Sequence, residues 1–166
     1  DAYLSPEMKS PGEAIGYDSS LTRALYKALR SSGMDVANYG TLFATIADVD
    51  KEKALPLIRR FYNLGFNIEG TKGTAEFLRQ NGIRTRYRAK LSEGSDEIFT
   101  ALRQGHINYV INTMDISQGD STRDGYEIRR CAVENNVSIF TSLETVQVLL
   151  DVLEEITLGV STIDAE

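Results

Sequence analysis

Short apolar runs alternate with segments of helical spacing along most of the chain, and this alternation limits its possible folds more than any other feature. The apolar runs predict strands at residues 41–46, 66–69, 83–91, 109–112 and 137–140. The segments between and after them predict helices at residues 53–64, 74–81, 95–104, 124–135 and 142–158. Such alternation is typical of a mainly parallel sheet with helices on both faces. We therefore expect one doubly wound α/β domain.

Glycine and proline residues predict where the helices begin and end. Gly65 and Gly82 follow the first two helices, and glycine most readily takes the left-handed conformation beyond a helix end. Pro56 lies in the first helix, where its missing amide would leave a hydrogen bond unmade. A helix start near Lys53 avoids this conflict, because the first four amides of a helix have no partner within it.

The first 35 residues differ in character from the rest. Residues 1–20 include two of the three prolines and show no steady period, so they predict an extended lead-in. A short helix that ends at Gly33 follows. We expect residues 1–35 to form a lead-in segment with a linker helix, and residues 36–166 to form the main domain.

Composition excludes several classes of protein. The 166 residues include 24 acidic and 18 basic ones, and the net charge of −6 argues against general nucleic-acid binding. A single cysteine, Cys131, and a single histidine, His106, exclude a disulfide framework and metal sites made of several cysteines or histidines. No apolar run reaches the roughly 18 residues of a membrane helix, and no signal-peptide pattern follows Asp1. We expect a cytoplasmic piece of a longer protein, without nucleic-acid or membrane partners.

The loops after the strands are the expected place for a ligand, because open α/β sheets bind ligands beyond the carboxyl ends of their strands. The sharpest signal there is the segment GTKGT at residues 70–74, which leads from the second strand directly into a helix. Its glycines allow a ligand close to the backbone, its threonines supply hydroxyl donors, and a helix N-terminus attracts anions. The alternative is a strand–helix turn that needs glycine for geometry alone. The loop by itself leaves both interpretations open.

Three lysines near the same edge of the sheet favour a phosphate site. They fall at or just beyond the carboxyl ends of the predicted strands, together with threonine hydroxyls, in a chain that is otherwise acidic. The predicted phosphate-binding residues are Thr45, Lys51, Thr71, Lys72, Gly73, Thr74 and Lys90. Asn112 and Thr113 follow the fourth strand and are placed to hydrogen-bond a ribose or base. Asp124 is placed to accept from sugar hydroxyls or a base amine.

Other chemically notable side chains have a structural explanation. His106 precedes the fourth strand, at the opposite edge of the sheet, and Cys131 fits a packed position on a helix rather than a nucleophile. Basic residues that alternate along the third strand, and so share one face, are Arg84, Arg86, Arg88 and Lys90. This pattern suits a nucleic-acid ledge or a charged edge strand, and the acidic net charge favours the edge strand.

Several motifs resemble those of one known family. The opening residues 3–13, YLSPEMKSPGE, resemble the segment that joins the second ATP-grasp half of the carbamoyl phosphate synthetase large subunit to its C-terminal regulatory domain. Further similar motifs are DKEKALPL at residues 50–57, GTKGTA at 70–75, INT at 111–113 and RDGYEIRR at 123–130. The similarity extends from residue 2 to about residue 150.

This resemblance implies a methylglyoxal-synthase-like fold, a Rossmann-type sheet of five parallel strands with helices on both faces. It implies a regulatory domain without catalytic residues, metal ligands or a cofactor of its own, which binds a nucleotide effector of the UMP, IMP or UTP class. The parent would be a ligase that uses ATP with Mg or Mn, together with bicarbonate and glutamine or ammonia, to supply pyrimidine and arginine biosynthesis. Expected partners are the ATP-grasp domains of the same large subunit and the glutaminase small subunit.

The resemblance also assigns residues within the site. It places the effector phosphate at Thr45, Lys51, Thr71, Thr74 and Lys90. It places the ribose and base near Asn112, Thr113, Asp124, Glu127 and Ile128.

Two other functions remain open at this point. One is a free-standing methylglyoxal-synthase-type lyase acting on a triose phosphate, for which Asp96 lies close to the expected place of a general base. The relatives with that activity also use a histidine, and the sequence offers none near this edge of the sheet. The other is the cyclohydrolase domain of purine synthesis, which shares the fold. Neither function explains the lead-in motif.

Overall fold

The computed structural model describes residues 7–8, 24, 27, 37–114 and 119–164, of which 7–8, 119–122 and 158–164 are described by their backbone alone. Most of the expected lead-in and linker helix lies outside these residues. The boundary proposed after residue 35 therefore stays a prediction.

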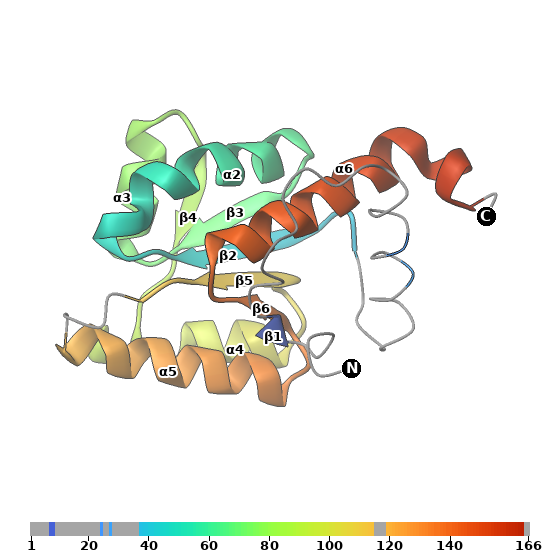
Figure 1. Ribbon diagram of the computed structural model, residues 1–166. Helices are drawn as coiled ribbons and strands as arrows, with labels where there is room; N and C mark the ends of the chain where they lie inside the picture. The colour runs from blue at the N-terminus through green and yellow to red at the C-terminus, as the bar shows by residue number, and fades with distance from the viewer. Residues whose placement is uncertain (1–6, 9–23, 25–26, 28–36, 115–118, 165–166) are drawn as a thin grey trace.

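A single sheet of six parallel strands forms the centre of the molecule (Figure 1). The strands are β1 (Glu7–Met8), β2 (Thr41–Thr45), β3 (Asn67–Gly70), β4 (Thr85–Tyr87), β5 (Tyr109–Asn112) and β6 (Ser138–Phe140). Their order across the sheet is β1-β6-β5-β2-β3-β4. The five expected strands are confirmed, and the lead-in adds the short strand β1 at the edge beside β6.

The strand order places a switch point between β2 and β5. From β2 the chain proceeds outward through β3 to β4, and it then returns to the other side of β2 as β5. β2 pairs with β3 through Thr41 and Asn67, and with β5 through Leu42 and Tyr109. A crevice beyond the carboxyl ends of such neighbouring strands is the usual ligand site of an open α/β sheet.

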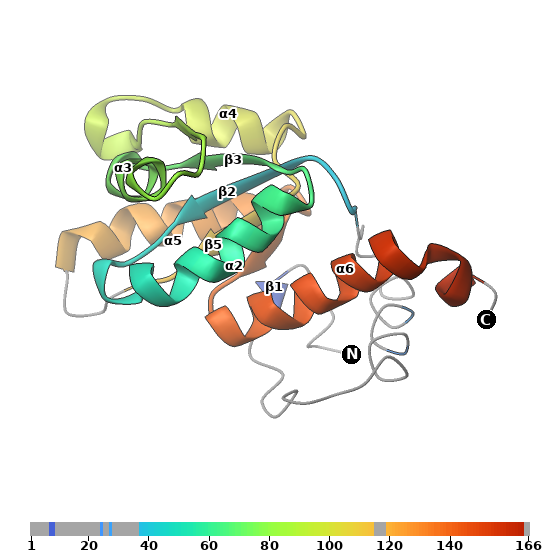
Figure 2. The same cartoon turned by 90° about the horizontal axis from the view of Figure 1, so that it is seen from above.

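Helices cover both faces of the sheet. They are α2 (Lys51–Asn63), α3 (Lys72–Gln80), α4 (Glu97–Arg103), α5 (Gly119–Glu134) and α6 (Leu143–Asp164), with 3₁₀ turns η2 (Asp48–Asp50) and η3 (Leu91–Glu93). Viewed from above, α2 and α6 lie side by side over one face, while α5 lies beneath the strands (Figure 2). None of the described helices is both long enough and apolar enough to cross a membrane. The layered α/β fold is therefore the one that the alternating sequence predicts.

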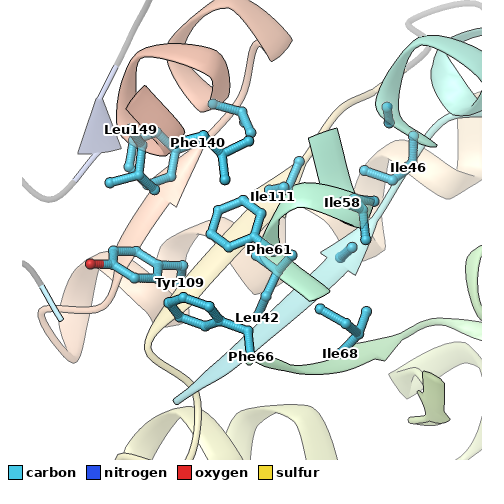
Figure 3. Close-up of a cluster of buried hydrophobic side chains, with 14 of the residues drawn as sticks. Leu42, Ile46, Ile58, Phe61, Phe66, Ile68, Tyr109, Ile111, Phe140 and Leu149 are labelled. Atoms are coloured by element: carbon cyan, nitrogen blue, oxygen red, sulfur yellow. The ribbon is translucent and has the colours of Figure 1, made fainter. Parts of the chain in front are cut away.

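The larger of the two buried clusters lies between the sheet and α2, α3 and α6. Figure 3 shows the aromatic rings of this cluster, with Phe61 of α2 close to Phe66 and Tyr109. The Phe61 and Phe66 rings meet edge to face at 5.2 Å, and Tyr109 of β5 lies 6.3 Å from Phe61. The Tyr109 hydroxyl donates to the Ala37 carbonyl oxygen at 2.6 Å, so this buried phenol keeps a hydrogen-bond partner.

The helix ends agree with the glycine signals, but the start of α2 does not agree with the prediction from Pro56. Gly65 and Gly82 have φ angles of 100° and 83°, in the left-handed region that favours glycine. α2 begins at Lys51, preceded by η2, so Pro56 lies inside the helix beyond its first turn. The expected start near Lys53 was wrong, because the 3₁₀ turn continues directly into α2 and extends it toward its N-terminus.

The third predicted strand is shorter than expected. β4 lies at the edge of the sheet, as predicted, but it ends at Tyr87 and the chain then enters η3. Arg84 and Arg86 are exposed, whereas Arg88 is buried. The expectation that Arg88 shares their solvent-facing row was wrong, because it turns inward to pair with Glu69.

Candidate functional site

A cavity of about 250 Å³ opens beyond the carboxyl ends of β2, β3 and β5. It therefore lies at the switch point between β2 and β5. Its lining residues are Thr45, Ile46, Ala47, Asp48, Lys51, Thr71, Gly73, Thr74, Lys90, Asn112, Thr113, Met114, Asp124 and Gly125. Polar side chains from three strand ends thus meet in one cavity.

Hydrogen bonds made by threonine hydroxyls link the segments that follow the strands at this cavity. Thr74 Oγ1 accepts from the backbone amide of Ile46 at 3.0 Å, and Thr113 Oγ1 accepts from that of Ala47 at 2.9 Å. The Thr71 hydroxyl donates to Thr45 Oγ1 at 3.2 Å. The loop after β2 is therefore fixed by contacts from both neighbouring strand ends.

The N-terminal turn of α3 lines the cavity. Thr71 precedes the helix in an extended conformation, and Gly73 lies in the first turn. A β-carbon added at Gly73 would lie 3.2 Å from Lys51 Nζ, so the ammonium group rests against the first turn of α3. The amides of a first turn have no intrahelical partner, and a helix N-terminus attracts negative charge. The ammonium and the helix end together provide the elements of an anion site.

Each of the two lysines in the cavity faces a carboxylate. Lys51 pairs with Asp48, whose side chain is exposed. Lys90 Nζ lies 3.9 Å from Asp124 Oδ2, which also accepts from the Ser92 hydroxyl at 2.7 Å. Asp124 is therefore held in the cavity wall, whereas solvent surrounds Asp48.

Asn112 supplies a buried acceptor to the same cavity. Its side chain is 1% exposed, and its Nδ2 donates to the Gly125 carbonyl oxygen at 3.1 Å. Within the described part of the chain, its Oδ1 has no hydrogen-bond partner. A buried amide oxygen normally accepts a hydrogen bond, so this atom calls for a donor from a ligand or water.

The cavity thus offers two chemically different kinds of group. Lys51, Lys90 and the N-terminus of α3 offer positive charge and donors, which suit a phosphate. Asn112 Oδ1 and the Asp124 carboxylate accept hydrogen bonds, so they suit hydroxyl or amine groups. The arrangement fits a phosphate ester of a hydroxylated molecule better than a bare phosphate ion.

Most of the predicted site residues come together here. Those that line the cavity are Thr45, Lys51, Thr71, Gly73, Thr74, Lys90, Asn112, Thr113 and Asp124. Three others do not line it. Lys72 is exposed at the start of α3, and Glu127 pairs with Arg130 on the surface of α5. Ile128 is buried in the cluster beneath the sheet, because the apolar face of α5 packs there.

Sequence reasoning missed several lining residues. Ile46, Ala47 and Asp48 follow β2, and Met114 and Gly125 lie beside Asn112. A β-carbon added at Gly125 would lie 2.9 Å from Met114 Sδ, so this glycine permits the close contact between α5 and the residues after β5. The pattern RDGYEIRR includes Gly125, but nothing local in it indicates that contact.

Two residues considered for catalysis lie outside the cavity. Asp96 is exposed just before α4, and His106 is exposed before β5, toward the amino ends of the strands. Neither lines the cavity. Among the described residues, no group of three histidine, cysteine or acidic side chains is arranged to hold a metal ion.

Cys131 is expected to react slowly with thiol reagents in the folded protein. It is buried on α5, and burial raises the pKa of its thiol, which lowers the fraction of reactive thiolate at neutral pH. We expect modification by a disulfide reagent at pH 8 to be at least roughly tenfold faster in the chain unfolded by guanidinium than in the folded chain. Equal rates in the two states would contradict the packed position.

Comparison with known families gives a match over the centre of the chain. Residues 53–141 match the family model described as the MGS-like domain. This stretch extends from the first turn of α2 to the end of β6, so it includes the lining residues from Thr71 to Gly125 and covers more than half of the chain. The protein therefore belongs to the family of MGS-like domains.

Proposed function

We propose that this chain is the nucleotide-binding allosteric domain of a carbamoyl phosphate synthetase large subunit. In this proposal the cavity at the β2–β5 switch point holds a nucleotide effector of the UMP, IMP or UTP class. The chemistry takes place elsewhere in the parent, on ATP-grasp domains that use ATP with Mg or Mn and receive ammonia from a glutaminase small subunit. The parent would be a cytoplasmic enzyme that serves pyrimidine and arginine biosynthesis.

The observation that best supports a nucleotide is the presence of cationic groups and hydrogen-bond acceptors in one cavity. A nucleoside monophosphate has a dianionic phosphate at one end and ribose hydroxyls and base amines beyond it. Lys51 and Lys90 suit the phosphate, while Asn112 Oδ1 and Asp124 suit the donors of the ribose and base. Inorganic phosphate would leave the buried Asn112 oxygen without a donor from the ligand, which is unfavourable.

Neither residue considered for lyase chemistry lines the cavity, and the two carboxylates that do line it, Asp48 and Asp124, face Lys51 and Lys90. A lyase that acts on a triose phosphate needs a general base within hydrogen-bond reach of the carbon acid. Asp96 lies outside the cavity, and the single histidine is near the opposite ends of the strands. The lead-in motif at residues 3–13 adds support, because it resembles the junction of the synthetase and has no purpose in a free-standing lyase.

Regulation requires that the effector bind two conformations of the parent unequally. The difference in binding free energy sets the largest possible change in activity, typically about 1–3 kcal/mol. The loop after β2 and the N-terminal half of α5 both border the cavity. Effector binding is therefore expected to affect the positions of these two segments most directly.

Calorimetric titration of the 166-residue chain with UMP, IMP and UTP tests the proposal. We expect saturable binding of at least one nucleotide, and we expect UMP to bind at least roughly tenfold more tightly than uridine or inorganic phosphate alone. Uridine lacks the phosphate, and inorganic phosphate lacks the ribose and base, so the comparison separates the contributions of the two kinds of group.

The competing function is tested with the same protein. Incubation with dihydroxyacetone phosphate is expected to yield no methylglyoxal. Turnover of this triose phosphate would overturn the regulatory proposal in favour of the lyase. The absence of saturable binding for all three nucleotides would also count against it.

A further inference from the structure

A chain of two ion pairs, the first of them buried, leads from β3 to the segment that contains Lys90. Arg88 Nε lies 2.5 Å from Glu69 Oε1, and both side chains are about nine-tenths buried. On its other side, Arg88 Nη1 lies 3.4 Å from Glu97 Oε1 at the start of α4. The Arg88 amide also donates to the Gly70 carbonyl oxygen at 2.8 Å, next to the loop that opens α3.

Glu97 reaches the backbone beside Lys90 directly. Its Oε2 accepts from the amide of Ala89 at 3.1 Å and from the Ser95 hydroxyl at 3.5 Å. The Glu97 carboxylate thus accepts hydrogen bonds from both ends of the short segment from residue 89 to residue 95. This segment needs such contacts, because β4 ends at Tyr87 and supplies no strand pairing beyond it.

Hydrogen bonds within the segment also hold its backbone in place. The Lys90 amide donates to Glu93 Oε1 at 2.8 Å, and this hydrogen bond holds the pKa of the Glu93 carboxyl below its usual range. The amide of Ser95 donates back to the Lys90 carbonyl oxygen at 3.2 Å. With its backbone fixed in this way, Lys90 directs its ammonium group into the cavity, where it meets Asp124.

We infer that Glu97, together with Arg88, is a positioning residue that sets where the Lys90 ammonium group lies in the ligand cavity. The inference rests on the proposed function, because it assigns Lys90 to the phosphate of the bound nucleotide. Glu97 itself lies outside the cavity, so it acts on the ligand through the segment from residue 89 to residue 95, and we assign that action to Lys90.

The test is a double-mutant cycle measured by calorimetry with UMP as the probe. Glu97→Gln removes the charge but keeps an oxygen acceptor, and the Glu97 side chain is 37% exposed, so the variant is expected to fold. We expect it to weaken UMP binding about threefold to tenfold in the otherwise unchanged chain. In a Lys90→Ala background, the same substitution is expected to change the affinity by less than about twofold.

A matched control is available on α6. Glu144 also lies in the first turn of a helix, but it is exposed and does not line this cavity. Glu144→Gln changes the net charge equally and is expected to leave UMP affinity within about twofold of the unchanged chain. Equal losses from Glu97→Gln with and without Lys90 would indicate general weakening of the fold and would overturn the inference.

Hydrogen exchange separates this inference from the proposed function. Glu97→Gln is expected to speed amide exchange at least about threefold at Ala89 and Lys90, with the strand β5 amides unchanged. Unchanged exchange at Ala89 and Lys90 would overturn the inference whether or not a nucleotide binds. Faster exchange in a chain that binds no nucleotide would support the positioning contact and would refute the proposed function instead.

A variant that loses both charges of the buried Glu69–Arg88 pair tests the role of Arg88. Removing Arg88 alone would leave Glu69 buried without its partner, and such a variant commonly fails to fold. Glu69→Gln combined with Arg88→Met removes both charges together and is expected to fold. It is expected to weaken UMP binding about as much as Glu97→Gln, and wild-type affinity in this variant would contradict a role for Arg88.

Discussion

Replacement of Phe61 by alanine is expected to lower the free energy of unfolding by about 3–5 kcal/mol. The ring is 0% exposed and fills the space between α2, the sheet and Phe66. Its edge-to-face contact with Phe66 and its packing against Tyr109 would both be lost. The remaining cavity cannot collapse easily, because the side chains packed around it belong to the strands and helices of one buried cluster. Chemical denaturation followed by circular dichroism measures the change.

The neighbouring aromatic residue provides the matched control. Tyr62 follows Phe61 on the same helix, but it is 37% exposed. Tyr62→Ala removes a ring of similar size from the surface, so we expect a loss below about 1 kcal/mol. Similar losses from the two substitutions would mean that α2 does not bury Phe61 as described.

Replacement of Lys51 by alanine is expected to weaken nucleotide binding roughly tenfold to a hundredfold, because a hydrogen bond between charged groups contributes about 1.5–3 kcal/mol. Lys51 lines the cavity, and its ammonium group rests against the first turn of α3. Calorimetric titration with UMP at fixed ionic strength measures the loss. The ionic strength must be fixed because added salt screens the attraction between a lysine and a phosphate.

Lys72 distinguishes the sequence prediction from the structure. The sequence places both lysines at the phosphate, but the structure leaves Lys72 exposed and outside the cavity lining. We therefore expect Lys72→Ala to weaken UMP binding by no more than about threefold, through long-range attraction alone. An effect as large as that of Lys51→Ala would show that the bound state brings Lys72 to the phosphate.

The sequence predicted the fold because its signals are local. Alternating periods identify strands and helices, and Gly65 and Gly82 fix two helix ends through conformations that glycine adopts readily. The sequence also identified the loop at residues 70–74, since glycines and threonines before a helix need no knowledge of distant residues. The start of α2 was missed because a 3₁₀ turn precedes it and Pro56 suggested a later start.

The candidate site depended more on contacts between distant residues. Because β5 pairs with β2, Asn112 lies close to Thr45, although these two residues are far apart in the chain. The sequence did place Ile128 near a ligand, but the packing of α5 against the sheet buries it instead. Its apolar side chain fits either position, so only the tertiary structure separates them.

The sequence by itself determined the class of fold and the order of its elements, and it predicted the edge of the sheet where the candidate cavity lies. The tertiary structure decided the strand order, the inward turn of Arg88 and the meeting of Lys51 with the first turn of α3. The physical reason is the range of the interactions involved. Backbone conformation and hydrophobic period depend on neighbouring residues, whereas burial and ion pairing depend on which distant elements pack together.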